Sequence, residues 1–181
     1  MSSSTVTRSI ATGLAAALSA AVTFGLAGPA HAQPEGPVSC DASGSSRFTP
    51  GVQAVPQPVA VTYVGDNRAC QDPDYTSARF TANFRSVALS CLASDPGQGS
   101  GSGSGTIHWS TGESSQVDLT LESTALNTAT VSGTVREGPF AGQRFSGKFT
   151  TDLVGGAFNC SFGAPTGGVT SADFTGSYTV G

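Results

Sequence analysis

From residue 57 to the C-terminus, apolar and polar residues alternate along most of the chain. Val59, Val61 and Tyr63, for example, are separated by Ala60 and Thr62. A period of two predicts strands with one buried and one solvated face, and a domain built only from such strands must pack two sheets or close one into a barrel. We therefore predict an all-β fold, an antiparallel sandwich or flattened barrel of about eight strands, mostly a meander. The predicted strands lie around 59–63, 78–90, 107–109, 117–122, 131–136, 145–150, 158–162 and 172–180.

One predicted strand, 78–90, changes its apolar face partway along. Phe84 has an even position, whereas Val87 and Leu89 have odd positions. These residues can share one face only if an extra residue forms a bulge or bend, which we predict near Ser86.

The N-terminal segment has the features of an export signal. Arg8 supplies a positive charge, residues 10–26 are uncharged and mostly apolar, and Ala30–Ala32 has the small-large-small order of a cleavage site. We predict that residues 1–32 are a signal peptide cleaved after Ala32. The protein would then be secreted, with no membrane span after cleavage.

The rest of the chain is predicted to form a single β domain that follows a short irregular segment. Residues 33–56 contain several prolines and no clear alternation, so we expect an irregular lead-in, followed by the β domain at 57–181. Within that domain, residues 96–105 are nearly all Gly and Ser. Because such residues cannot build a hydrophobic core, we expect a mobile loop there.

Composition narrows the classes of partner. Removal of 32 of the 181 residues leaves 149, and loss of Arg8 leaves 7 basic against 12 acidic residues, a formal charge of −5. Only 11% of the chain is charged. A lightly charged, mildly acidic surface argues against nucleic acid or an anionic membrane as partner, and we expect a monomer.

The four cysteines, Cys40, Cys70, Cys91 and Cys160, all follow the predicted signal peptide. In an oxidising compartment an even number predicts two disulfides, and four cysteines allow three connectivities. No pair has Cys-x-x-Cys spacing and one histidine remains after cleavage, so we assign no metal site.

Two nine-residue segments resemble each other. Residues 76–84 and 170–178 are identical at five positions, and a cysteine precedes each, Cys70 and Cys160. One explanation is convergence, because Thr, Ser and Ala are common in strands; the other is a duplication that makes two related halves. Under the second, matched cysteines favour a Cys70–Cys160 bridge, which leaves Cys40 to pair with Cys91.

Candidate catalytic groups are few. His108 is flanked by Ile107 and Trp109, so it faces the opposite side of its strand from the tryptophan. Three of the four carboxylates that a glycosidase could use alternate with apolar residues, which favours a solvated face. These carboxylates are Asp118, Glu122, Asp152 and Asp173. We assign no catalytic residue and no cofactor.

Aromatic residues in two predicted loops are the best candidates for exposed contacts. Tyr75 lies in the loop 71–76 and Phe140 in the loop 137–143. Most other aromatic residues fall on apolar strand faces, where core packing explains them.

Two stretches carry a resemblance to known proteins. Residues 105–112 read GTIHWSTG, and residues 131–142 read VSGTVREGPFAG. They resemble small secreted β-rich proteins of Streptomyces-type actinobacteria, over about residues 50–181. The resemblance implies a secreted all-β domain and no catalytic residues, because no activity is established for the group.

These observations favour a non-enzymatic, extracellular or cell-envelope binding protein. Its partner would be an extracellular protein or a glycan. Two alternatives stay open: a carrier that holds a small hydrophobic ligand inside the β domain, and an inhibitor of a secreted hydrolase or protease.

Overall fold

Eight long strands make up the fold in the computed structural model, which describes residues 36–90, 99–125, 128–151 and 168–181. Along each strand, buried residues alternate with exposed ones, as the sequence pattern predicts. The described residues contain no helix, and therefore none with the length and apolar character that crossing a membrane requires. The strands are β1 (Val38–Val52), β2 (Gln57–Ala69), β3 (Ser77–Leu89), β4 (Gly101–Trp109), β5 (Ser114–Ala125), β6 (Thr128–Glu137), β7 (Arg144–Thr151) and β8 (Val169–Val180).

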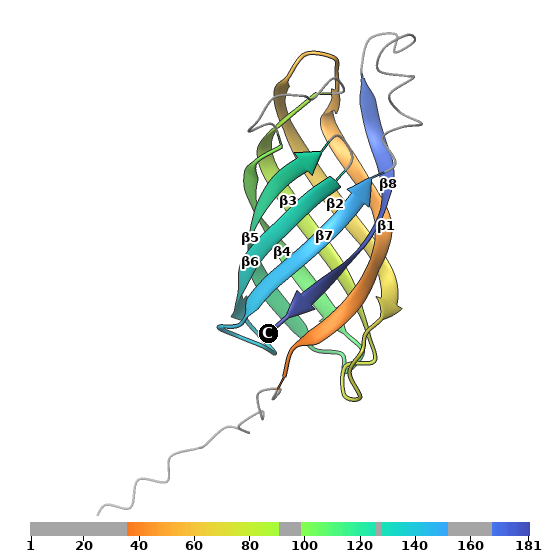
Figure 1. The fold of residues 1–181 in the computed structure, drawn as a ribbon, viewed down its shortest axis with the longest axis vertical. Coiled ribbons are helices and arrows are strands. Elements are labelled where there is room, and N and C mark those ends of the chain that lie inside the picture. The colour runs from red at the N-terminus through yellow and green to blue at the C-terminus, as the bar shows by residue number, and fades with distance from the viewer. Residues whose placement is uncertain (1–35, 91–98, 126–127, 152–167) are drawn as a thin grey trace, which may run out of the picture. The chain divides into compact units, whose positions relative to one another are not determined.

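The strands form one closed up-and-down barrel (Figure 1). Each strand is antiparallel to the next, and β8 returns to pair with β1 from Val38–Val180 to Val52–Val169. Closure pairs both edges of the sheet and so removes the exposed edge that an open sheet would present. The predicted all-β meander is confirmed, and of the two predicted architectures the chain adopts the barrel.

The barrel has two ends that differ in their connections. We call the end of the barrel that is drawn lowest in Figure 1 the lower end. Three connections join strands there: β2–β3, β4–β5 and β6–β7. The other connections join strand ends at the opposite, upper end. The chain from residue 33 to 181 forms one compact unit, and the predicted signal peptide lies outside the described residues.

The expectation of an irregular lead-in at 33–56 is wrong for most of that segment. Residues 38–52 form β1, a strand of 15 residues that pairs with both β2 and β8. Its inward positions are occupied by residues such as Cys40, Ala42 and Ser46, all of them buried. Val38, Phe48 and Val52 are buried as well, but the small or polar residues between Val38 and Phe48 leave the apolar alternation too weak for a sequence pattern to reveal.

The Gly/Ser tract also belongs partly to the barrel wall, contrary to the expected loop at 96–105. Strand β4 begins at Gly101, and its glycines take the inward positions while Ser102 and Ser104 are exposed. The tract is therefore a strand with period two whose inward residues lack side chains. Residues 96–98 of the tract lie outside the described residues.

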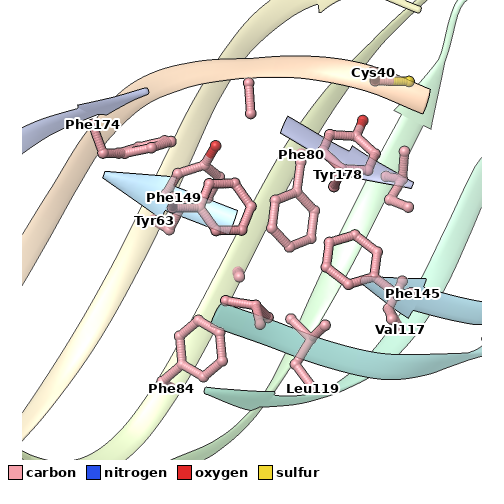
Figure 2. Packing of buried hydrophobic residues seen from close by; sticks show 14 of the residues in the cluster. Cys40, Tyr63, Phe80, Phe84, Val117, Leu119, Phe145, Phe149, Phe174 and Tyr178 are labelled. Atoms are coloured by element: carbon pink, nitrogen blue, oxygen red, sulfur yellow. The ribbon is translucent and has the colours of Figure 1, made fainter. Parts of the chain in front are cut away.

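Aromatic rings fill the barrel and account for these glycines. A Cβ atom on Gly105 would lie 2.7 Å from Cε2 of Phe80 and 2.8 Å from Cδ1 of Leu119. The ring centroid of Phe80 is in turn 5.0 Å from that of Phe145 and 5.5 Å from that of Tyr178. Glycine on one wall thus makes room for a ring from another strand. Figure 2 shows the rings of Tyr63, Phe80, Phe145, Phe149, Phe174 and Tyr178 packed together, with Phe84 farther along the lumen.

The matched segments 76–84 and 170–178 fall on β3 and β8. Strand β3 runs from the lower to the upper end, and β8 runs the opposite way. A duplication that keeps the chain order would relate β1–β4 to β5–β8, so β3 would match β7. The topology therefore contradicts two related halves. The similarity reflects a shared alternation of inward apolar and outward polar residues.

The disulfide that the structure contains joins Cys40 to Cys70. This contradicts both bridges of the pairing favoured by the sequence, Cys70–Cys160 and Cys40–Cys91. The physical reason is the β1–β2 register, in which Gly44 faces Gly65 and a local bridge then places Cys40 opposite Cys70. Cys91 and Cys160 lie outside the described residues.

Candidate functional site

The two aromatic residues expected to make exposed contacts are instead inside the barrel. Tyr75 is 9% exposed and Phe140 is 1% exposed. Together with Trp109 they form a three-ring cluster, with centroids 5.0 to 5.1 Å apart, that plugs the lower end. The expectation is wrong because each loop folds its aromatic residue inward, where burial of a large ring is favourable. Phe140 does so even with a φ of 66°, a region that bulky residues rarely adopt.

Hydrogen bonds and the disulfide hold the loops of this plug in place. Asp72 accepts hydrogen bonds at one carboxylate oxygen from the backbone N–H groups of Asp74 and Tyr75, both at 2.9 Å. Ser115 accepts a hydrogen bond from Nε1 of Trp109 at 2.8 Å and donates to the carbonyl of Pro139 at 2.6 Å. Burial, with nearby acidic residues as a smaller cause, raises the pKa of the Tyr75 phenol. The lower end is therefore a braced structural element.

The candidate catalytic residues lie on the outside of the barrel. His108 is exposed on β4, on the opposite face from the buried Trp109 as predicted, and its Nδ1 is 2.9 Å from Oγ of Ser114. Asp118, Glu122 and Asp173 are exposed, as expected for a solvated face, and Asp152 lies outside the described residues. Asp118 forms a surface ion pair with Arg136 at 3.4 Å. In the part of the chain that is described, no group of three or more His, Cys, Asp or Glu residues is placed to hold a metal ion.

Two polar atoms in the barrel interior stand out chemically. The hydroxyls of Tyr63 and Tyr178 are buried and have no hydrogen-bond partner within the described residues. Burial raises the pKa of both phenols, and for Tyr63 the neighbouring Tyr178 raises it further. An unpaired buried hydroxyl costs about 1–3 kcal/mol. The rings of Phe80, Phe149 and Phe174 pack against the Tyr63 ring in this part of the lumen (Figure 2).

A hollow of about 610 Å³ lies on the outer wall, where β2, β3 and β4 run side by side. It is open to solvent, and its lining includes the short, exposed side chain of Ala60 on β2 and the backbone of Gly103 on β4. Polar side chains surround these two residues, and Oγ1 of Thr62 donates to Oδ1 of Asn83 at 3.1 Å. The lining residues are Ala60, Thr62, Asn83, Phe84, Arg85, Ser102, Gly103 and Ser104.

A bulge in β3 lies beside this hollow and confirms the one predicted near Ser86. The register passes from Val59–Val87 to Val61–Phe84, which leaves one extra residue on β3. Ser86 has a φ of 54°, in the left-handed region that costs a non-glycine residue about 1 kcal/mol or more. Bulges and such strained residues are over-represented at functional sites, where they redirect a side chain. Here the residue next to the strained position is Arg85, which lines the hollow.

The charged residues on the parts of β2, β3 and β4 that form the hollow are positive, although the next strand, β5, places the exposed Asp118 opposite Ser104. Residues 57–64 of β2 and the whole of β3 and β4 contain no Asp or Glu, although the chain as a whole is acidic. Arg79 and Arg85 are both exposed on this wall. The guanidinium of Arg85 makes no hydrogen bond or ion pair with another residue in the described ranges. An unneutralised cation in a polar hollow is suited to bind an anion.

Sequence reasoning missed this hollow because its residues signal nothing individually. Exposed Ser, Thr and Asn are the expected outward residues of any strand, and Gly103 belonged to the supposed loop. The bulge predicted near Ser86 was the one signal that marked the position. Comparison of the chain with protein-family models, curated proteins and solved structures found no match.

Proposed function

We propose that this protein is a secreted, non-enzymatic binding protein that takes its ligand in the hollow on the β2–β4 wall. The observation that carries the proposal is the hollow itself: polar residues and an unpaired arginine surround about 610 Å³ on rigid strands beside a strained bulge. A site on regular strands is pre-organised, so ligand binding pays little for ordering the protein. We thus assign the binding role to the outer wall formed by β2–β4, and not to the loops 71–76 and 137–143 as the sequence suggested.

Secretion is part of the proposal, and two observations support it. Residues 1–32 have the signal-peptide pattern, and the Cys40–Cys70 disulfide is of a kind that persists in oxidising compartments. Expression in a secreting host and N-terminal analysis of the protein in the medium test it. We expect the chain to start at Gln33; retention of Met1 on the recovered protein would contradict cleavage.

The two alternative functions have less support. A carrier needs free space in the lumen, which aromatic rings occupy around Phe80. An inhibitor needs a protruding reactive loop; the 71–76 connection is braced by the disulfide, but its aromatic residue, Tyr75, is buried.

Filling the hollow tests the proposed function. Ser104→Trp places a large ring at the hollow, whereas Ser146→Trp places the same ring at an exposed position on β7, away from the hollow. Cosedimentation of the secreted protein with insoluble cell-envelope material and extracellular polysaccharide measures binding. We expect the first variant to lose retention and the second to keep it. Equal retention of both variants would place the binding surface elsewhere.

A further inference from the structure

The chemistry of the hollow defines a class of ligand, and this inference rests on the proposed function. We propose that the hollow binds a segment of an acidic polysaccharide. A carboxylate on one sugar unit pairs with Arg85, and ring hydroxyls exchange hydrogen bonds with Thr62, Asn83 and Ser104 around it.

The charge of the ligand follows from Arg85. Its guanidinium has no ion-pair partner in the described ranges, and Asp118, which lies opposite Ser104 on the neighbouring strand β5, is paired with Arg136 at 3.4 Å. A guanidinium presents a planar fork of donors that matches a carboxylate in a bidentate pair. A second arginine, Arg79, lies six residues earlier on the same face of β3, about 20 Å along the strand. An extended ligand with repeated negative charge reaches both.

The polyhydroxylated character of the ligand follows from the other side chains. Ser102 and Ser104 carry hydroxyls that can both donate and accept a hydrogen bond, whereas the Thr62 hydroxyl donates to Asn83 and can still accept one. Asn83 uses its Oδ1 to accept from Thr62, which leaves the two N–H donors of its amide for a ligand. Sugar hydroxyls have the same mixed character. An acidic peptide would place its other side chains in apolar pockets, and the exposed side chains of this hollow are polar or charged except for Ala60, which is short.

The site contains no exposed aromatic ring on which a sugar could stack. Binding by one charge pair and a few hydrogen bonds predicts a Kd of roughly 0.1–1 mM for a short oligosaccharide. Avidity along a polymer that meets several copies of the protein, or both arginines, would strengthen this. Added salt should weaken binding, because the charge pair is exposed to solvent.

Solution NMR of the secreted protein suits this affinity. Backbone amide shifts are followed during titration with trigalacturonate, with neutral maltotriose, and with triglutamate as an anion that is not a sugar. We expect trigalacturonate to shift the amides of 83–85 and 102–104, and the other two ligands to bind at least about tenfold more weakly. Arg85→Ala should weaken trigalacturonate binding about tenfold or more, whereas Lys148→Ala, which removes the same charge from an exposed position on β7, should change it less than twofold.

The outcomes separate this inference from the proposed function. If maltotriose shifts the same amides with equal affinity, the hollow is a binding site but the inferred acidic ligand is wrong. Equal or tighter binding of triglutamate would replace the sugar with an acidic peptide. If none of the three ligands shifts these amides, the inferred ligand class is wrong. The cosedimentation of the Ser104→Trp variant then decides the proposed function: loss of retention supports it, and unchanged retention contradicts it.

Discussion

Replacement of Gly105 by alanine separates two descriptions of the Gly/Ser tract. In a mobile loop, Gly→Ala should change the stability by less than about 0.5 kcal/mol, because alanine restricts the folded and the unfolded chain to a similar extent. In the barrel, Gly105 is an inward position of β4 that pairs with Ala82 and Val117 on its two neighbours. The two descriptions therefore predict different results for one added methyl group: almost no change in a loop and a clear destabilisation in the barrel.

The structure gives the magnitude. The new Cβ would lie 2.7 Å from Cε2 of Phe80, 2.8 Å from Cδ1 of Leu119 and 2.9 Å from a backbone oxygen. The Phe80 ring cannot move aside, because four other rings surround it with centroids 5.0 to 6.1 Å away. Overpacking of this kind costs about 1–3 kcal/mol, and the effect on the unfolded chain offsets part of it. We expect a net loss of about 1–2 kcal/mol.

Urea denaturation followed by the fluorescence of Trp109, the single tryptophan, measures the free energy of unfolding. Ser104→Ala is the control, because its side chain is exposed on the same strand and the substitution should change stability by less than about 0.5 kcal/mol. A Gly105→Ala protein that is as stable as the wild type, or more stable, would refute the packing of β4 against Phe80.

Three further predictions address the lower end and the interior. Non-reducing peptide mapping should return a Cys40–Cys70 peptide, and a Cys40–Cys91 peptide would contradict the β1–β2 register. Mutation of both Cys40 and Cys70 to alanine should lower the free energy of unfolding by about 2–4 kcal/mol, as measured by thermal or urea unfolding. Phe140→Ala should cost about 3–5 kcal/mol by urea unfolding, because the ring is buried in the three-ring plug, and a cost below 1 kcal/mol would argue that the loop is loose. Burial raises the pKa of the two interior phenols above the usual value of about 10, so only the unfolded chain releases these protons just above that pH. Stability should then fall as the pH rises beyond about 10, by up to about 1.4 kcal/mol per pH unit for each phenol, and Tyr178→Phe should reduce that slope.

Much of the fold could be predicted from the sequence, because period-two alternation is a local signal. Strands with large inward residues, such as Val117 and Leu119 on β5, were placed correctly. The bulge at Ser86 was also predicted, since it shifts the parity of large apolar residues. Strand β1 and the start of β4 were missed because the inward residues in the middle of β1 and at the start of β4 are glycine, alanine, serine or cysteine. Those residues are small because rings from other strands fill the space, which no local pattern records.

The candidate site was predicted less well. Tyr75 and Phe140 lie in loops, and loop position alone favours exposure; only the folded barrel shows that the ends of the lumen accept their rings. The hollow depends on the lateral order of β2, β3 and β4, which brings Thr62, Asn83 and Ser104 together from distant parts of the chain.

The sequence by itself determined the class of the fold and, for most strands, which residues face inward, because the alternation of apolar and polar residues sets which face of a strand is buried. Only the tertiary structure decided that the sheet closes into a barrel, that Cys40 bonds to Cys70, and that Arg85, which has no ion-pair partner among the described residues, stands in a polar hollow. The physical reason is that each of these depends on register and closure between strands. Many pairings satisfy the same local pattern, and packing of the rings in the lumen selects one of them.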